Sequence, residues 1–220
     1  MHNVNLLTKY ENNRLIRPLL QLIPLGIGSG IDSFLMITLN KMRQKRVEIF
    51  FDKLSEGTIC IHDDYLRSDE FVHKYMVTMK YVIDTQQKEK IEMFANIFKS
   101  SLDSEKRIFN LNVYEDFSGI LNNLSYREIC ALEIFERFYN KKQIDEHENE
   151  LQLIFKFWKE FEEKMEIELG VSKNSVENYM IKISRTGCYQ EITGGFLDYS
   201  GGKGKLTPLY FELRDYVLEK

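Results

Sequence analysis

The chain has 220 residues, 43% of them hydrophobic and 29% charged, which is an ordinary composition for a soluble globular protein of one or two domains. Its net charge of −4 excludes a protein that coats nucleic acid by positive charge alone, although a local basic patch stays compatible with it. The three cysteines, Cys60, Cys130 and Cys188, are far apart and odd in number, which excludes a disulfide framework and favours a cytoplasmic protein with core cysteines. The N-terminus also lacks the pattern of a secretory signal.

The first apolar stretch, Leu19–Leu39, contains a single charged residue, Asp32, and has the length of a membrane span. Pro24 and the glycines of segment 26–30 oppose a continuous helix, and Asp32 would be costly inside a bilayer. We therefore expect a short helix to about Ile23, a glycine-rich turn and a long helix from Asp32. A membrane-associated effector that uses this stretch stays an alternative.

The long helix predicted from Asp32 to Leu54 is the most basic part of the chain. Its apolar side is formed by Phe34, Ile37, Met42, Val47, Phe50, Phe51 and Leu54. Its basic residues are Lys41, Arg43, Lys45, Arg46 and Lys53. Two interpretations stay open: a solvated helix face, or a patch that faces an anion, nucleic acid or an acidic partner.

Helical spacing of apolar residues continues through the middle of the chain. Ser68 begins a helix with an acidic first turn that ends at Asp84-Thr85, and Ser125–Glu128 has the capping-box pattern. His62–Asp64 has no second cluster at a suitable spacing, so no metal site is predicted. The predicted helices cover about 69–83, 91–101, 109–124, 126–139 and 151–169.

The last of these helices carries four large aromatic residues, Phe155, Phe157, Trp158 and Phe161, spread too widely around it for one core stripe. This spread predicts that one side of the helix packs against another chain or against the N-terminal helices. The preceding segment, Lys141–Glu150, is polar and charged and is interpreted as a surface loop or a frayed helix start.

A short amphipathic helix is predicted after Ser172, which is a good N-cap residue. Its buried side is formed by Val176, Tyr179, Met180 and Ile183, which follow helical spacing. Gly187 suits the left-handed position that ends many helices, so the predicted helix ends shortly before it.

A β-hairpin and a final helix are predicted next. Cys188–Thr193 has strand character, Gly194-Gly195 is a hairpin-type turn, and Phe196–Tyr199 can return as the second strand. Gly201–Lys205 contains three glycines and is interpreted as a flexible basic tip. Thr207-Pro208 is a strong helix start, because Thr can cap the helix and Pro suits its first position.

The order helix, hairpin, basic loop and helix is the second half of a winged helix-turn-helix. It resembles bacterial winged-helix domains in which a helix ends in an Arg-Thr-Gly turn and the wing closes on Leu-Thr-Pro, here Arg185–Gly187 and Leu206–Pro208. The predicted fold is therefore mainly α-helical. An N-terminal helical bundle occupies residues 1–110, and a winged helix-turn-helix with a small β-hairpin occupies residues 111–220.

The short helix of this module has a polar face opposite its apolar side, and we expect this face to contact a partner. Its residues are Asn174, Asn178, Ile181 and Arg185, with Lys182 at the edge. Asn and Arg can pair with adenine and guanine edges in DNA, whereas Ile181 fits a protein contact. Gly170–Lys220 contains seven Lys/Arg against six Asp/Glu, a low basic content for a DNA-binding domain. DNA binding and protein docking both stay open, with Lys203 and Lys205 as further contact residues.

No catalytic pattern stands out in the sequence. We find no Ser/His/Asp set, no activated-cysteine signature, no paired-His metal motif and no nucleotide-binding glycine loop. We therefore predict a protein without enzymatic activity, metal, cofactor or small-molecule substrate.

Four segments carry a likeness to a known group of proteins. They are Pro24–Asp32, Arg43–Leu54 (RQKRVEIFFDKL), Thr85–Phe98 with its Lys-Glu-Lys-Ile core, and the Arg185–Gly187 turn. In the order of its elements the chain resembles bacterial proteins of the Abi-alpha type, which are associated with abortive infection and mobile elements. The likeness in sequence is confined to these short segments, and it implies phage defence as a context and no particular reaction.

Two functions follow as hypotheses. The first is a non-enzymatic cytoplasmic accessory or sensor protein of a phage-defence or mobile-element system. Its N-terminal bundle binds a protein partner or self-associates, and its winged helix docks on protein and, in one version, on nucleic acid. The alternative is a sequence-specific DNA-binding transcription regulator that dimerises through its N-terminal helices.

Overall fold

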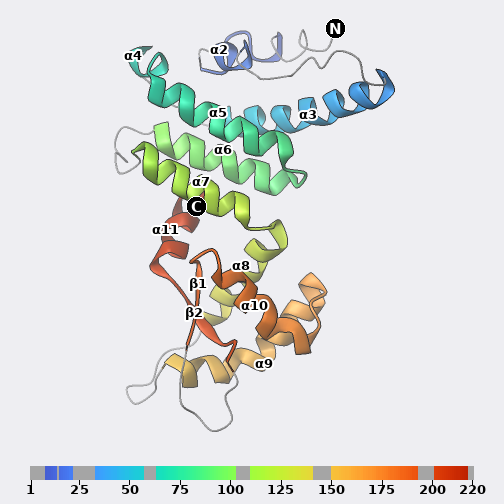
Figure 1. Ribbon diagram of the computed structural model, residues 1–220, viewed down its shortest axis with the longest axis vertical. Helices are drawn as coiled ribbons and strands as arrows, with labels where there is room; N and C mark the ends of the chain where they lie inside the picture. Colours follow the sequence, from blue (N-terminus) through green and yellow to red (C-terminus); the bar gives the residue numbers. More distant parts are fainter. Residues whose placement is uncertain are drawn as a thin grey trace. The chain divides into compact units, whose positions relative to one another are not determined.

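The structure is a computed structural model that describes residues 8–13, 15–21, 33–56, 63–102, 110–140, 150–192 and 201–217 (Figure 1). Mainly helical, it has a small two-stranded antiparallel sheet near the C-terminus, as predicted. The chain divides into two compact units. Unit 1 comprises Met1–Ser118 with Val217–Lys220, and unit 2 comprises Gly119–Tyr216. This boundary lies eight residues after the predicted division at residue 110, inside a helix.

Unit 1 is built from helices whose starts are set by local capping. Asn13 Oδ1 accepts hydrogen bonds from the backbone of Leu15 and Ile16 at 3.1 and 3.0 Å, and Ser68 Oγ accepts one from Phe71 N at 3.2 Å. The helices are α2 (Ile16–Gln21), α3 (Ser33–Leu54), α4 (Asp63–Leu66), α5 (Asp69–Asp84), α6 (Lys88–Leu102) and α7 (Leu111–Asn123), the last of which ends in unit 2.

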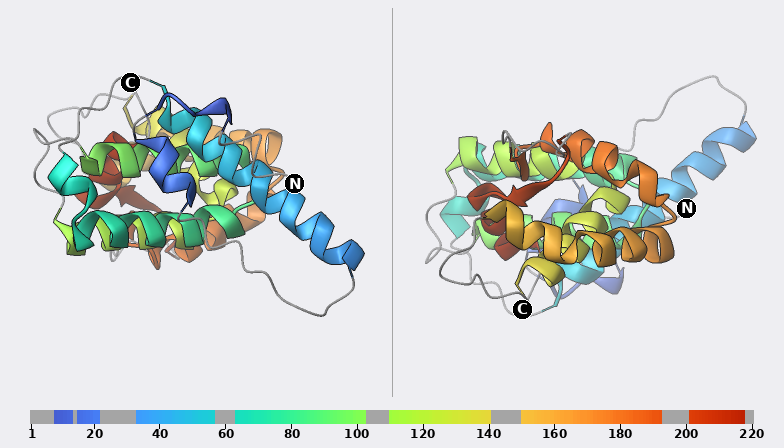
Figure 2. Two further views of the ribbon diagram at one scale, coloured as in Figure 1. Left: turned by 90° about the horizontal axis from the view of Figure 1, so that it is seen from above. Right: turned by 90° about the horizontal axis from the view of Figure 1, so that it is seen from below.

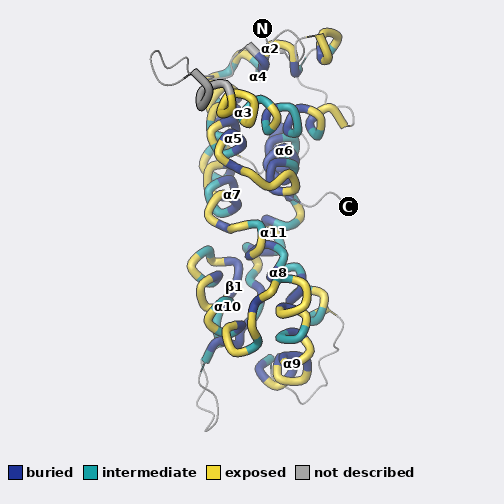
Figure 3. Tube along the Cα trace, turned by 90° about the vertical axis from the view of Figure 1, so that its right-hand side faces the viewer, coloured by how far each residue is buried: buried dark blue, intermediate teal, exposed yellow. Residues whose placement is uncertain are grey.

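The core of unit 1 lies where α3, α5 and α6 pack together (Figure 3). Phe50, Phe71 and Tyr75 each bring a ring to within 5.9–6.2 Å of the Phe98 ring. All four side chains are buried, as helical spacing predicts. The prediction that Met42 belongs to the same apolar side is wrong, because its side chain is 44% exposed. The N-terminal part of α3 extends beyond α5 and α6 (Figure 2).

Unit 2 begins with the end of α7 and continues through a second set of short elements. The predicted capping box is confirmed, since Glu128 N donates to Ser125 Oγ at 3.2 Å and Ser125 N donates to Glu128 Oε2 at 2.8 Å. The elements are α8 (Tyr126–Tyr139), α9 (Glu150–Leu169), the 3₁₀ helix η1 (Lys173–Ser175), α10 (Val176–Ser184), β1 (Tyr189–Glu191), β2 (Gly204–Leu206) and α11 (Pro208–Val217).

The hairpin of unit 2 differs from its predicted form. β1 pairs antiparallel with β2, so that Tyr189 faces Leu206 and Glu191 faces Gly204. The prediction that Gly201–Lys205 forms a flexible basic tip is wrong, because these residues lead into and form β2. The glycines are needed for close packing: a side chain at Gly204 would place its Cβ 2.2 Å from the carbonyl oxygen of Gln190.

The core of unit 2 is aromatic. The Phe135 ring lies 5.3–5.6 Å from the rings of Phe157, Phe161 and Tyr189. Among the four aromatic residues of α9, Phe157, Phe161 and Trp158 are buried in this core, whereas Phe155 is 48% exposed. The wide spread of aromatic residues around α9 therefore reflects three core positions and one outer position.

The ends of α10 and α11 test three further predictions. Thr207 Oγ1 accepts from Tyr210 N at 3.3 Å and Pro208 opens α11, as predicted. Gly187 has the predicted positive φ of 76°. Ser172 does not cap the helix with its side chain, because its hydroxyl bonds the Ser175 hydroxyl at 2.9 Å and a 3₁₀ turn opens the segment instead.

Several predictions fall on residues that the structure does not describe. They concern the glycine-rich turn in 22–32, Cys60, His62, most of Lys141–Glu150, the Gly194-Gly195 turn and the return strand Phe196–Tyr199. Within the described ranges, no helix combines the length and the apolar composition that crossing a bilayer requires.

Candidate functional site

The outer face of η1 and α10 is the predicted contact surface. Val176, Met180 and Ile183 anchor α10 in the core of unit 2. Asn174 and Asn178 lie on the opposite side and are exposed, and Ile181 is 40% exposed between polar neighbours. Helical periodicity predicted that Asn178 and Ile181 face away from the core, and both are exposed; Asn174, in the preceding 3₁₀ turn, is exposed as well.

Arg185 was predicted to lie on this face as a contact residue, and the structure gives its guanidinium a different environment. Nη1 and Nη2 donate to the two carboxylate oxygens of Glu128 at 2.8 and 3.0 Å, and Nη2 also donates to the carbonyl of Asn123 at 2.9 Å. Lys182 Nζ approaches the same carboxylate at 3.3 Å. This bidentate pairing holds Arg185 against α8 and the end of α7, so its first role is to fix α10 in place.

Glu128 is the group on which this arrangement depends. Its side chain is 1% exposed, and burial alone would raise the pKa of its carboxyl. The hydrogen bonds from Arg185 and from Ser125 outweigh burial and lower the pKa of Glu128 to about 2. The carboxylate therefore stays ionised at neutral pH. The capping-box pattern identified Glu128 in the sequence, but nothing local indicated its pairing with Arg185.

Lys203 and Lys205 also lie in environments that their predicted role did not include. Lys203 is buried, with its ammonium bonded to Glu177 on α10 and 4.9 Å from the centre of the Trp158 ring. Lys205 Nζ lies 2.7 Å from Glu150 at the start of α9. Both lysines therefore join β2 and the segment before it to neighbouring helices.

The predicted basic patch lies on α3 in unit 1. Lys41 and Lys45 are exposed, whereas Arg43 and Arg46 are half-buried and the Arg46 guanidinium donates to the carbonyl of Ile83. The predicted contact residues therefore lie on α3 in unit 1, and on η1, α10 and the β2 region in unit 2.

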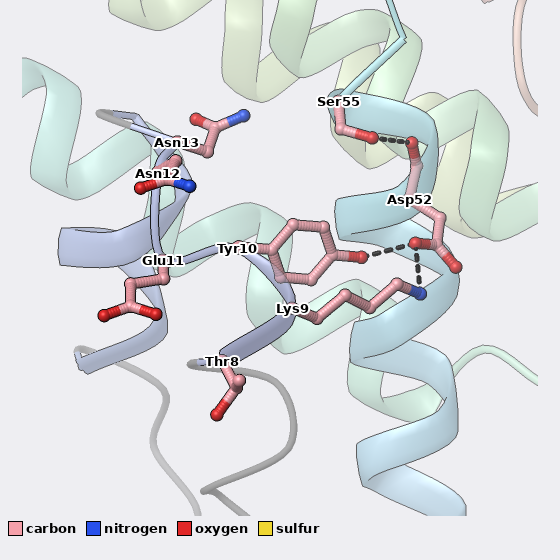
Figure 4. Close-up of a pocket in the computed structure, with 8 residues that line it drawn as sticks. All are labelled: Thr8, Lys9, Tyr10, Glu11, Asn12, Asn13, Asp52 and Ser55. Atoms are coloured by element: carbon pink, nitrogen blue, oxygen red, sulfur yellow. Dashed lines mark hydrogen bonds and ion pairs between the residues drawn. The ribbon is translucent and has the colours of Figure 1, made fainter.

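An open polar pocket of about 460 Å³ adjoins α3 in unit 1. Figure 4 shows Lys9 and Tyr10 pointing from the N-terminal segment toward Asp52 on α3. Lys9 Nζ lies 2.6 Å from Asp52 and 3.1 Å from Glu48, and the Tyr10 hydroxyl donates to Asp52. Burial would raise the pKa of Asp52, but the hydrogen bonds from Lys9 and Tyr10 lower it.

These contacts tie residues 8–13 to α3, and sequence reasoning missed them because their partners are about 40 positions apart. Hydrogen bonding to Asp52 raises the pKa of Lys9 in turn. Asp52 is the centre of this arrangement, because it accepts from both Lys9 and Tyr10 and so fastens the N-terminal segment to α3. Among the described residues, no group of three His, Cys, Asp or Glu side chains could hold a metal ion.

A buried lysine, Lys74 on α5, is a second feature that the sequence did not reveal. Its side chain is 1% exposed, and its Nζ lies 2.7 Å from Glu70 and 3.2 Å from the Tyr65 hydroxyl. The ammonium also faces the Tyr65 and Tyr114 rings at 5.9 and 5.6 Å from their centres. Lys74 is thus held by an anion, a hydroxyl and two rings.

The chain was also compared with known proteins. No family model, no curated protein and no solved structure matches it.

Proposed function

We propose that the chain is a non-enzymatic accessory or sensor protein of a bacterial phage-defence or mobile-element system, and that it docks a protein partner through a C-terminal winged helix. In this proposal η1 and α10 form the docking helix, and the β1–β2 hairpin forms the wing. The succession of helix, hairpin and helix supports the winged-helix assignment. The resemblance to Abi-alpha-type proteins supports the defence context.

Ile181 is the observation that carries the choice of a protein partner. It lies 40% exposed on the outer face of α10, between the exposed residues Asn178 and Lys182. A large apolar side chain at such a position gains free energy when another protein surface covers it, by about 25 cal/mol per Å² of apolar area. Within a DNA groove, the main apolar group that it could meet is a thymine methyl.

The distribution of charge supports the same choice. Residues 119–216 contain 13 Lys and Arg against 17 Asp and Glu, whereas the residues of unit 1 contain 17 of each. Near the docking face, Arg185 and Lys203 pair with the carboxylates of Glu128 and Glu177. DNA affinity depends largely on cations that neutralise phosphates, so a unit whose cations face its own carboxylates suits a protein partner better.

A sequence-specific transcription regulator is the second candidate, and Asn174 and Asn178 favour it. Both amides are exposed on the same face, and an amide can pair with an adenine edge. A salt titration of binding to duplex DNA from the gene's own locus, against a scrambled duplex, separates the two candidates.

We expect weak and equal binding to both duplexes at physiological salt. Tight binding that prefers the native duplex, falls steeply with salt and is lost in Asn174→Ala/Asn178→Ala would overturn protein docking in favour of the regulator.

Docking is tested by phage challenge of cells that carry the gene with its neighbouring genes. Ile181→Glu is expected to reduce protection, measured as plaque formation, because a charge at the centre of a docking face must be desolvated. Val72→Glu is the matched control, since Val72 on α5 is 37% exposed and the change adds the same charge. Full protection in Ile181→Glu would contradict docking through α10, and no protection by the wild type would contradict the defence context.

A further inference from the structure

In the N-terminal half of α3, two large apolar side chains are exposed among the residues that the structure describes. Residues 38–42 are all exposed, and the helix extends beyond α5 and α6 at this end (Figure 2). Leu39 and Met42 are 36% and 44% exposed. Because they are three residues apart, they lie on one side of the helix and form a single apolar strip.

This strip is bordered only by positive charge. From Ser33 to Val47 the helix contains four basic residues and no acidic residue. Lys41 and Lys45 are exposed and one helical turn apart, so they form one edge of the strip. A partner for α3 should therefore offer an apolar side chain surrounded by carboxylates.

The end of α9 in unit 2 has this chemistry. Ile167 is 76% exposed, the highest value among the large hydrophobic residues that the structure describes. Glu160 precedes it by seven residues and is exposed on the same side of the helix. Glu163 and Lys164 also border Ile167, and they pair with Lys173 at 3.2 Å and with Glu168 at 3.4 Å. Glu166 is adjacent and exposed, and unit 2 contains all of the excess negative charge of the chain.

We propose that the chain self-associates head to tail: Leu39 and Met42 of one copy pack on Ile167 of a second copy, and Lys41 and Lys45 face its glutamates. The two surfaces differ, so each copy keeps one of them available for the next copy, and assembly can continue or close into a ring. Each patch spans about two helical turns, well below the roughly 800 Å² per partner of a standard interface. The association is therefore weak, concentration-dependent and reduced by salt.

Charge reversal of each surface tests the proposal by sedimentation velocity over a range of concentrations at low salt. One variant is Lys41→Glu/Lys45→Glu, and the other is Glu160→Lys/Glu166→Lys. Each variant alone should associate at least about tenfold more weakly than the wild type, because it brings like charges together. An equimolar mixture of the two should regain association, since each variant supplies the complement that the other lacks. Unchanged fluorescence of Trp158, the one tryptophan, checks that unit 2 stays folded.

Three results would overturn the proposal. A wild-type chain that stays monomeric at every concentration excludes self-association. A Glu160→Lys/Glu166→Lys variant that associates like the wild type excludes α9 and points to symmetric pairing. Two variants that both fail to associate, alone and when mixed, exclude direct charge pairing between α3 and α9. No residue of α10 takes part in this contact, so a chain that stays monomeric can still dock a protein partner through α10.

Discussion

The most deeply buried charge of unit 1 is positive, whereas that of unit 2 is negative. The two most deeply buried charged side chains that the structure describes are Lys74 in unit 1 and Glu128 in unit 2. The carboxylate that faces Lys74 belongs to Glu70, which is 43% exposed, and the guanidinium that faces Glu128 belongs to Arg185, which is 42% exposed. Each unit thus pairs a buried charge with a half-exposed partner, and the signs are reversed.

The difference lies in which group remains after one partner is removed. Without Lys74, the remaining charge is Glu70, which water already solvates. Without Arg185, the remaining charge is Glu128, which water does not reach. The cost of breaking a pair therefore depends on the burial of the charge left behind, and removal of a buried charge itself can be nearly neutral.

Among the changes proposed here, loss of Arg185 should reduce the free energy of unfolding the most. Arg185→Ala leaves Glu128 buried without its bidentate partner and should destabilise unit 2 by about 3–5 kcal/mol. Trp158 is 4% exposed in unit 2, so urea unfolding followed by its fluorescence measures this loss. The control is Lys182→Ala, which removes a 61% exposed cation from the same carboxylate and should cost less than about 1 kcal/mol. Equal losses in the two variants would contradict the anchoring role of Arg185.

Acid should remove a similar amount of stability from unit 2. The pKa of Glu128 falls from 4.5 to about 2 on folding, so its ionised form stabilises the folded state at pH above 4.5. Protonation below that pH removes about 3 kcal/mol as the pH falls to 2. We expect the difference in unfolding free energy between the wild type and Glu128→Gln to shrink by this amount from pH 5 to pH 2. A difference that stays constant over that range would show that Glu128 keeps an ordinary pKa.

Two glycine-to-alanine changes compare a closely packed position with an open one. Gly204→Ala should cost about 2 kcal/mol, because its Cβ would lie 2.2 Å from the Gln190 carbonyl oxygen and 2.7 Å from the Tyr189 ring. Gly119→Ala on α7 meets no atom within 4 Å and should stabilise the helix by up to about 1 kcal/mol. Urea unfolding followed by circular dichroism measures both changes. A Gly204→Ala protein as stable as the wild type would contradict the close approach of β2 to β1.

The smallest effect is expected at Lys74. Lys74→Met keeps the length of the side chain, removes a buried charge and leaves Glu70 in water, so the loss should stay below about 1 kcal/mol. Hydrogen exchange of peptides from α5 and α7 measures this loss of stability. Glu70→Gln is the control, because it removes the other partner and leaves the buried ammonium behind; it should cost more than Lys74→Met. The reverse order would contradict the rule drawn from the two units.

Much of the fold could be predicted from the sequence because its signals are local. The Ser125–Glu128 box, the Ser68 cap and the Thr207-Pro208 start each act within one helical turn, and all three begin helices in the structure. Periodicity likewise placed Val176, Met180 and Ile183 in the core. These determinants depend on residues three or four positions apart, so one sequence suffices to find them.

The sequence predicted that a β-hairpin follows α10, but it did not predict which residues form the second strand. Glycines indicated a turn but occur in two clusters, Gly194-Gly195 and Gly201–Gly204, and local propensity assigned the second cluster to a loop. Pairing of β1 with Gly204–Leu206 depends on what the side chains of that strand meet elsewhere. Leu206 is buried, and Lys203 reaches Glu177 and the Trp158 ring, so burial overrides the glycine content.

By itself, the sequence determined most of the helices, the caps at Ser68, Ser125 and Thr207, the outward positions of Asn178 and Ile181 and the basic character of α3. Only the tertiary structure decided which charges are available. Arg185 meets Glu128 across 57 residues, and Lys203 meets Glu177 across 26. The local sequence around a charged side chain does not indicate whether that side chain faces water or a buried carboxylate. The difference arises from burial and pairing, which set the cost of moving a charge and depend on contacts between distant segments.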